Sequence, residues 1–131
     1  MGDMRAGSFA RLPWPPSVNA AWRAYQGRNI LSKVGRAYRK AAVAHVHELN
    51  GGEPEPLLGP LAMTIRMHPP DRRRRDVDNH AKAVLDACTH AGVWSDDSQV
   101  RELHLYMDEV SPRNGFVLIE INELTGDTEC S

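Results

Sequence analysis

The stretch of residues 71–100 most constrains the fold, because it holds more charge than a protein interior can accept. After Asp71 it contains five aspartates, four consecutive arginines and one lysine: Asp76, Asp78, Asp86, Asp96, Asp97, Arg72, Arg73, Arg74, Arg75 and Lys82. Carboxylates at this density destabilise a fold unless they face water or a cation. The stretch is therefore expected at the surface, and it predicts a site that binds cations.

Two amphipathic helices are predicted from residue spacing. Ser32 is the expected N-cap of the first, which ends at Asn50-Gly51-Gly52. Its inward positions are expected to be Val34, Ala37, Tyr38, Ala41, Ala42, His45, Val46 and Leu49, and its basic face carries Lys33, Arg36, Arg39 and Lys40. The second is expected to start at Asp78 as N-cap and to end at Gly92. Its inward positions are Ala81, Val84, Leu85, Cys88 and Ala91.

Strands are predicted at residues 8–12, 61–68, 100–110 and 116–124. The second should bury Leu61, Met63, Ile65 and Met67, and the third Leu103, Leu105 and Met107. The turn-forming residues 111–115 predict that the last two strands form a hairpin. The expected fold class is α/β (α+β): one small domain over residues 1–131, with a mixed β-sheet packed by two main helices and loose ends at 1–8 and 125–131.

The segment between the first strand and the first helix has two interpretations. Prolines force an extended path over residues 13–16, and residues 17–19 are expected to turn. Residues 20–28 then alternate aromatic and basic side chains, Trp22, Arg23, Tyr25 and Arg28. Such a segment can stack on bases and grip phosphates, or it can be a loop with its two aromatic rings packed inward. The sequence leaves both open.

Charge is distributed unevenly along the chain. Residues 1–52 hold eight Lys or Arg against two acids, and residues 53–131 hold eight against fifteen, so balances of +6 and −7 give the net charge of −1. This asymmetry is typical of a protein that attracts a polyanion with one surface and binds cations with another. Two cysteines make no disulfide framework, and no apolar run reaches the roughly 20 residues of a membrane span. A cytoplasmic protein without a membrane partner is expected.

The acidic positions are suited to hold a metal ion. In an extended segment, Asp76 and Asp78 point the same way, with their Cα atoms roughly 6–7 Å apart. Mg²⁺ prefers such oxygen ligands. Asp78, Lys82 and Asp86 would share one stripe of the second helix, although the spacing alone favours surface ion pairs, each worth under about 1 kcal/mol. Asp96 and Asp97 join the site only if a strand from Val100 pairs in the sheet.

Several motifs together resemble the RusA family of Holliday-junction resolvases. They are L-P-W-P-P-S-V-N at residues 12–19, D-R-R-R-R-D-V-D-N at 71–79, Lys82, D-A at 86–87, G-V-W at 92–94 and D-D-S-Q-V at 96–100. The D-x-D pattern alone is a weak signal. The order and spacing agree as well, and the resemblance runs from about Leu12 to Leu124.

The resemblance implies a small homodimeric, Mg²⁺-dependent endonuclease with a compact α/β fold, often carried by phages and prophages. It places the metal-binding aspartates at Asp76, Asp78 and Asp97 and the essential lysine at Lys82. Asp96 and Asp86 also match family positions, in supporting roles. His80 lies where no particular chemistry is expected.

The working hypothesis is metal-dependent hydrolysis of a phosphodiester in branched DNA, with Mg²⁺ as cofactor and Mn²⁺ as a substitute. Arg72, Arg73, Arg74, Arg75, Lys33 and Arg36 are expected to contact the DNA backbone. The resemblance implies that a homodimer nicks two strands of a four-way junction symmetrically. One alternative is a non-catalytic junction-binding or DNA-binding module in which the carboxylates only pair with arginines. Another is a phosphotransfer enzyme acting on nucleotides, but no nucleotide-binding loop is present.

Overall fold

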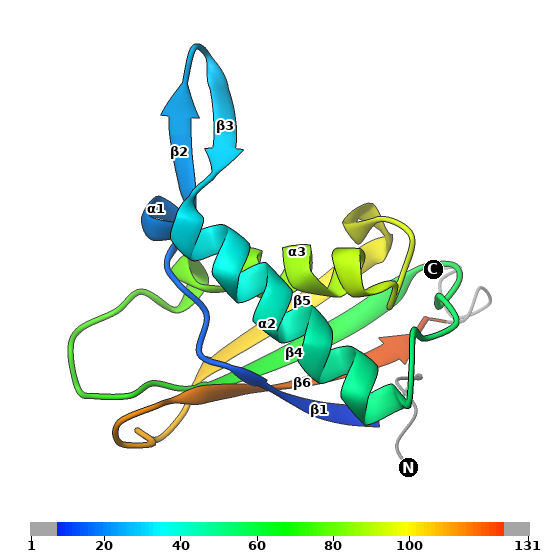
Figure 1. Ribbon diagram of the computed structural model, residues 1–131. Coiled ribbons are helices and arrows are strands. Elements are labelled where there is room, and N and C mark those ends of the chain that lie inside the picture. Colours follow the sequence, from blue (N-terminus) through cyan, green and yellow to red (C-terminus); the bar gives the residue numbers. More distant parts are fainter. Residues whose placement is uncertain (1–7, 125–131) are drawn as a thin grey trace.

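Four strands form the main sheet of the computed structural model, which describes residues 8–124 (Figure 1). The strands are β1 (Ser8–Pro13), β4 (Leu61–His68), β5 (Val100–Met107) and β6 (Phe116–Glu123), in the order β1-β6-β4-β5. β5 runs parallel to β4, and the other two pairs are antiparallel. Helices α2 (Lys33–Asn50) and α3 (Ala81–Ala91) lie on one face of this sheet. The predicted mixed sheet packed by two main helices is thereby confirmed.

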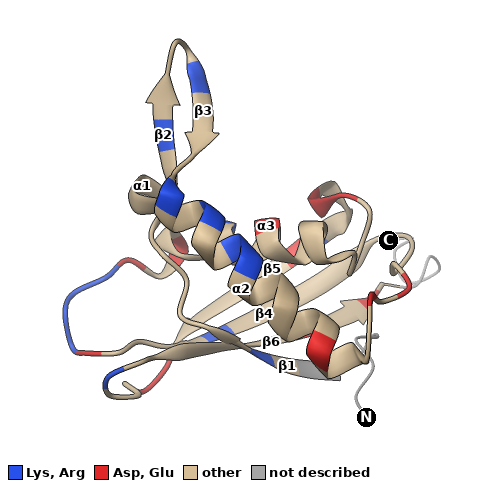
Figure 2. Cartoon of the chain, in the orientation of Figure 1, with Lys and Arg blue, Asp and Glu red and all other residues tan. Residues whose placement is uncertain are grey.

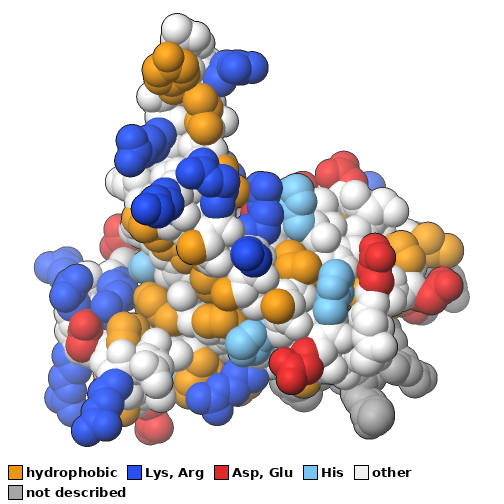
Figure 3. Space-filling model, in the orientation of Figure 1, with side chains coloured by type: hydrophobic (Ala, Val, Ile, Leu, Met, Phe, Trp, Pro, Cys, Tyr) orange, Lys and Arg blue, Asp and Glu red, His pale blue; other side chains and the backbone are white. Residues whose placement is uncertain are grey.

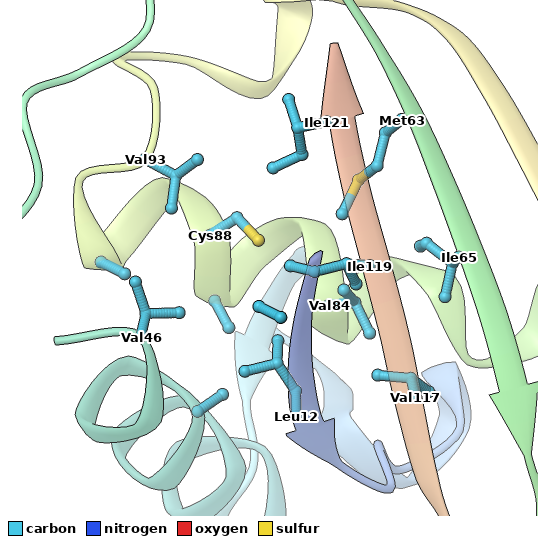
Figure 4. Close-up of a cluster of buried hydrophobic side chains, with 14 of the residues drawn as sticks. Leu12, Val46, Met63, Ile65, Val84, Cys88, Val93, Val117, Ile119 and Ile121 are labelled. Carbon is cyan, nitrogen blue, oxygen red and sulfur yellow. The ribbon is translucent and has the colours of Figure 1, made fainter. Parts of the chain in front are cut away.

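The central strand β4 carries the core. Leu61, Met63, Ile65 and Met67 are fully buried, as their alternation with polar residues predicted. Each such side chain contributes about 1.5–3 kcal/mol when it is removed from water. They pack with β6 and with the inner faces of the two helices (Figure 4). Trp94, just after α3, is also buried, and its Nε1 donates a hydrogen bond to Thr89 Oγ1 at 2.7 Å.

The predicted hairpin between the last two strands is wrong. β4 lies between β5 and β6 and pairs with both, so those two strands never meet. The connection over residues 108–115 instead passes the end of β4, where the backbone N–H of Ser111 donates to the carbonyl of Pro69. This connection is longer than the two to five residues of a usual hairpin loop, and it leaves room for a strand between its ends.

β5 is consequently an exposed edge strand. Its pairing with β4 puts Leu103 and Met107 on the helix-covered face of the sheet, in register with Met63 and Met67. Both were predicted to be buried, yet they are 40% and 36% exposed, and Leu105 is only partly buried. The edge of the sheet extends beyond the helices, so alternation placed these side chains on the correct face without burying them.

α2 begins and ends as the sequence predicts. Ser32 Oγ accepts a hydrogen bond from the Gly35 N–H at 3.0 Å, and Gly51 ends the helix in the left-handed conformation. Its buried positions are Gly35, Tyr38, Ala42 and Val46, and the other positions predicted to face inward are not buried: Val34, Ala37, Ala41, His45 and Leu49. The buried stripe is therefore narrower than the periodicity indicated, because α2 covers the outer part of the sheet, over β1.

Residues 17–31 form a short helix and a β-hairpin, whereas the sequence predicted a turn at residues 17–19 and left two interpretations open for residues 20–28. Ser17 caps a short helix, α1 (Val18–Ala21), and a separate hairpin follows, made of β2 (Trp22–Tyr25) and β3 (Arg28–Leu31). Gln26 and Gly27 link the two strands with φ of 50° and 76°, as a tight two-residue turn requires. In Figure 1 this hairpin extends away from the sheet and helices.

Gly35 allows close packing at the base of the hairpin. A Cβ at this position would collide with the carbonyl oxygen of Ala21 and with the side chain of Leu31. We expect Gly35→Ala to lower the free energy of unfolding by about 1–3 kcal/mol, measured by urea denaturation. An unhindered helical glycine replaced by alanine would stabilise the protein by about 1 kcal/mol, so a stabilised variant would contradict this packing.

Two further predictions concern cysteines and membranes. Burial raises the pKa of the Cys88 thiol to about 12, so this buried side chain is a packing residue rather than a nucleophile. Within residues 8–124, no helix combines the length and the apolar character that a bilayer span requires. Cys130 and nearly all of the predicted loose ends lie outside the described residues.

Candidate active site

Asp76 and Asp78 lie on the segment that enters α3. Asp76 is extended, with φ −85° and ψ 137°, and the 3₁₀ helix η1 (Val77–Asn79) follows it. The prediction that Asp78 is the N-cap of α3 is wrong, because α3 starts at Ala81 and His80 occupies the cap position. The predicted extended spacing is also wrong, because the N–H of Asn79 donates to the carbonyl of Asp76 and closes a turn. Asp78 therefore precedes the helix that carries Lys82 and Asp86 and does not share its stripe.

His80 holds this entry segment in place. It is 6% exposed, and its Nδ1 lies 2.9 Å from the carbonyl oxygen of Pro15. Its ring also contacts Trp14, with 4.9 Å between the ring centroids. This histidine thus connects the proline-rich segment to the start of α3. Its position agrees with leaving it out of the predicted site.

The four arginines do not pair with the candidate metal ligands. Arg75 forms an ion pair with Asp71 at 2.8 Å and lies over the ring of Trp14, and Arg73 donates to Asp71 through its backbone N–H. The Arg73 N–H, and then Arg75, lower the pKa of Asp71. Arg72 and Arg74 are exposed. One aspartate at the start of the loop therefore orders the arginine-rich segment.

Asp97 lies at the opposite end of α3. It opens a second 3₁₀ helix, η2 (Asp97–Gln99), which leads directly into β5. β5 pairs with β4, so the strand pairing from Val100 that the sequence argument required is present. η1 also lies against β5. The two acidic segments, far apart in the sequence, therefore both adjoin the same strand.

Asp96 has a local structural role. Its side chain accepts hydrogen bonds from the Gln99 backbone and, at 2.6 Å, from Ser98 Oγ, and Gln99 caps the Asp96 backbone in return. Gln99 Nε2 also donates to the carbonyls of Leu57 and Gly59, each at 3.0 Å. This network fixes η2 against the loop before β4. Asp96 thereby positions its neighbour Asp97, while its own carboxylate is engaged.

Asp86 bridges the two helices. Arg39 of α2 donates two hydrogen bonds to its carboxylate, at 2.9 and 3.0 Å, and His90 lies 3.7 Å from it. The pair is partly buried, with 32% of the Arg39 side chain and 21% of the Asp86 side chain exposed. A bidentate pair of this kind holds one geometry. The structure therefore gives Asp86 a helix-packing role, and Arg39 supplies the partner.

We expect Asp86→Asn to lower the free energy of unfolding by about 1 kcal/mol and to leave phosphodiester cleavage close to that of the unchanged protein. Arg39→Gln should have a similar effect, and the double variant should be little worse than either single one, because both remove the same pair. Thermal denaturation and a cleavage assay measure the two effects. A large loss of cleavage with unchanged stability would place Asp86 in the chemistry.

Asp76, Asp78 and Asp97 share a different character from Asp86 and Asp96. All three are exposed, and within the described part of the chain none of their carboxylates has an ion-pair or hydrogen-bond partner. Carboxylates without competing partners are the donors that a hard divalent cation prefers. No three His, Cys, Asp or Glu side chains among residues 8–124 lie close enough together to hold a metal ion. The donor chemistry fits such an ion, and the closed three-ligand arrangement is not formed.

Lys82 lies in the first turn of α3, close to the entry segment. Its side chain is exposed, and its Nζ lies 4.5 Å from the centroid of the Trp22 ring at the base of the hairpin. An ammonium over an aromatic face is attracted to the ring by about 0.5–1 kcal/mol at an exposed site, which favours this position of the side chain. Sequence reasoning missed this role of Trp22, for which the alternation of aromatic and basic residues was the only signal.

The basic residues gather on two surfaces near the site. Figure 2 shows Lys and Arg along the loop before η1 and along the hairpin and the N-terminal half of α2. Lys33 and Arg36 lie in the first turns of α2, where both are exposed and Arg36 donates to the carbonyl of Leu31 at 2.9 Å. The acids of α2 are confined to its C-terminal end, at Glu48. A polyanion can therefore approach the hairpin end of the molecule without meeting acids of α2.

Comparison with known proteins identifies close relatives over most of the chain. The sequence model described as "Endodeoxyribonuclease RusA" matches residues 13–122. A crossover junction endodeoxyribonuclease RusA from Escherichia coli is 42% identical over 115 residues, which cover 86% of this chain and 92% of that protein. Proteins of the same name from Enterobacteria phage 82 and Shigella sonnei are 41% and 40% identical over the same shares. The matched region contains every predicted site residue.

Proposed function

The chain belongs to the RusA family of endodeoxyribonucleases, and from this premise we propose that it resolves four-way (Holliday) junctions by hydrolysing phosphodiester bonds. Relatives over most of the chain are named crossover junction endodeoxyribonucleases. The observation that carries the proposal is the state of three carboxylates. Asp76, Asp78 and Asp97 remain exposed and without ion-pair partners among the described residues, although four arginines directly precede the first two of them in the sequence. Acids kept only to neutralise those arginines would be paired with them.

The proposal assigns Asp76, Asp78 and Asp97 to binding a divalent cation, Mg²⁺ with Mn²⁺ as substitute. Their oxygen donors suit either ion, and no cysteine or histidine is needed. When bound, the ion would activate a water and stabilise charge on the attacking and leaving oxygens. Three carboxylates brought together repel one another unless a cation neutralises them. We therefore expect ion binding to draw the η1 and η2 segments closer.

Lys82 would neutralise negative charge that develops on the phosphoryl oxygens in the transition state. Its position on the first turn of α3, beside η1, places an ammonium next to the acidic entry segment. Because its side chain is exposed and is steadied by Trp22, it can reach a phosphate that docks on this surface. This role does not require Lys82 to bind the metal.

The arginine-rich loop and the start of α2 would hold the DNA backbone. Arg72, Arg73, Arg74 and Arg75, with Lys33 and Arg36, provide the cations on the two basic surfaces near the site. Contacts with phosphates position a protein on DNA without reading its sequence. This agrees with a nuclease that recognises the shape of a branched substrate.

The proposal includes a homodimer. One chain offers one candidate site, and two symmetric nicks across a four-way junction need two copies related by a two-fold axis. The edge strand β5 exposes Leu103 and Met107 on the same face of the sheet, an apolar surface that a second chain can cover. The proposed place of action is the cytoplasm, where the DNA substrate lies. Sedimentation analysis tests the association state.

The proposed function is tested by incubating the protein with a mobile four-way junction and with a linear duplex of the same sequence. We expect paired, symmetric nicks in the junction with Mg²⁺, no nicks with EDTA, and little cleavage of the duplex. Lys82→Ala should bind the junction and cut it slowly. A non-catalytic binding module would shift the junction in a gel with or without metal and would never nick it, and that result would overturn the proposal.

A further inference from the structure

The β2–β3 hairpin is largely exposed to solvent. Three of the four residues in β2 and three of the four in β3 are exposed, and the hairpin forms its own two-stranded sheet. Figure 3 shows it standing clear of the body, with apolar and basic side chains along it. An isolated hairpin is at best marginally stable in water. Its projection therefore needs a reason other than packing.

Pairing between the strands sorts their side chains by type. Arg23 lies opposite Ile30, and Tyr25 lies opposite Arg28. Directly opposed residues point to the same side of an antiparallel pair, and side chains two apart along a strand do so as well. All four side chains therefore share one face, and all are exposed. Trp22, Ala24, Asn29 and Leu31 share the other face, which meets the body at Trp22 and Leu31.

The exposed face is cationic and aromatic, and acids are distant in the sequence. No Asp or Glu occurs between Asp3 and Glu48. Among the described residues, neither guanidinium on this face has an ion-pair partner. Tyr25, next to the tip, is 57% exposed, so its ring is free to stack on a base. Two further exposed cations, Lys33 and Arg36, follow the hairpin in the first turns of α2.

The base of the hairpin is fixed to the candidate active site. Ser32 Oγ donates to the carbonyl of Ala20 at 2.6 Å, and the Ser32 N–H donates to that of Ala21 at 2.7 Å. Gly35 lets this junction close tightly. Trp22 lies beneath the Lys82 ammonium, 4.5 Å from it. The hairpin is thus a supported arm whose position relative to α3 is set by direct contacts.

We propose that the β2–β3 hairpin is a second DNA-binding element, which contacts the junction with its exposed face. Arg23 and Arg28 bind backbone phosphates, and Tyr25 stacks on a base exposed where the strands branch. A ribbon of two strands that presents cations around one aromatic ring matches the chemistry of a nucleic-acid strand, in which phosphates flank flat bases. This inference rests on the proposed function, since it assumes a branched DNA substrate.

The test compares junction binding by three variants over a range of salt concentrations. Arg23→Gln/Arg28→Gln should weaken binding about tenfold and reduce the slope of log affinity against log salt by about 2, because two phosphate contacts are lost. Tyr25→Ala should weaken binding roughly 5- to 100-fold with an unchanged slope, and more for the junction than for linear duplex. The matched control is Arg11→Gln/Arg66→Gln, which removes two cations that lie over Phe116 and Tyr106 elsewhere on the sheet.

The outcomes separate this inference from the proposed function. If the hairpin variants bind the junction like the control while the unchanged protein cleaves it, the arm is not a DNA contact and the nuclease proposal stands. If the unchanged protein neither binds nor cleaves the junction, both fail. In a third outcome, a hairpin variant stops self-associating and still binds the junction as tightly as the unchanged protein does. That result would identify the hairpin as a contact between two copies of the chain, and it would also overturn the inference. Circular dichroism should show unaltered melting, because the substituted side chains are exposed.

Discussion

Asp76→Asn is expected to abolish junction cleavage and to leave junction binding intact or tighter. The substitution keeps the size of the side chain and removes one carboxylate from the proposed cation site, so the attacking water loses its activation. Loss of a single group that stabilises the transition state costs about 10²- to 10³-fold in rate, and loss of a metal ligand should cost at least as much. Binding should not suffer, because the change also removes a negative charge that repels phosphate.

The matched control for Asp76→Asn is Glu102→Gln. Glu102 is an exposed carboxylate on β5 whose alternation with Leu103 points it to the sheet face away from the helices. It therefore changes the net charge equally without touching the candidate site. Cleavage rates with excess enzyme, binding in EDTA and the midpoint of thermal unfolding are measured for both. If the Asp76 variant unfolds, the residue has a structural role. If the variant cleaves the junction as fast as the control does, Asp76 has no role in cleavage.

Lys82→Ala is expected to slow cleavage by about 10²- to 10³-fold and to weaken junction binding much less. The lysine is one of several cations proposed to face the DNA, and it lies on the first turn of α3, beside the acidic entry segment. Its expected effect is therefore on the rate of the chemical step. Single-turnover kinetics at saturating enzyme separate that rate from affinity.

Trp22→Leu is the control for the contact between the Lys82 ammonium and the Trp22 ring. It removes the ring under the ammonium and retains the lysine itself. If Lys82 acts on the phosphate, this change should slow cleavage far less than Lys82→Ala does, and Lys82→Arg should recover part of the rate. An equal loss in Trp22→Leu and Lys82→Ala would mean that the lysine serves only to anchor the hairpin.

Much of the fold could be predicted because it follows from local patterns. The N-cap at Ser32, the stop at Gly51 and the alternation along β4 each result from interactions within a few residues. The pairing of β5 with β4 did not follow from such patterns. Parallel pairing joins strands far apart in the chain through a helix, and nothing in β5 itself identifies its neighbour. The nearest turn signal therefore gave the wrong partner.

The site could be predicted in composition and only partly in geometry. The motifs identified the acids and Lys82, while the separate roles of Asp86 and Asp96 depend on partners that spacing does not reveal. Arg39, the partner of Asp86, lies on the other helix, and Asp96 is engaged by the turn that follows it. The start of α3 also differs from the prediction. The buried His80 contacts the carbonyl of Pro15 and occupies the cap position that Asp78 was predicted to fill.

The most direct test of the central claim is a Mn²⁺ titration followed by electron paramagnetic resonance, with an uncleavable junction present. The account predicts that Asp76→Asn, Asp78→Asn and Asp97→Asn each weaken Mn²⁺ binding by about tenfold or more, while Asp86→Asn leaves it unchanged. Such a result would show that carboxylates from the η1 and η2 segments share one ion. Binding by Asp97→Asn as tight as that of the unchanged protein would contradict the account, because the two segments would then not form one site.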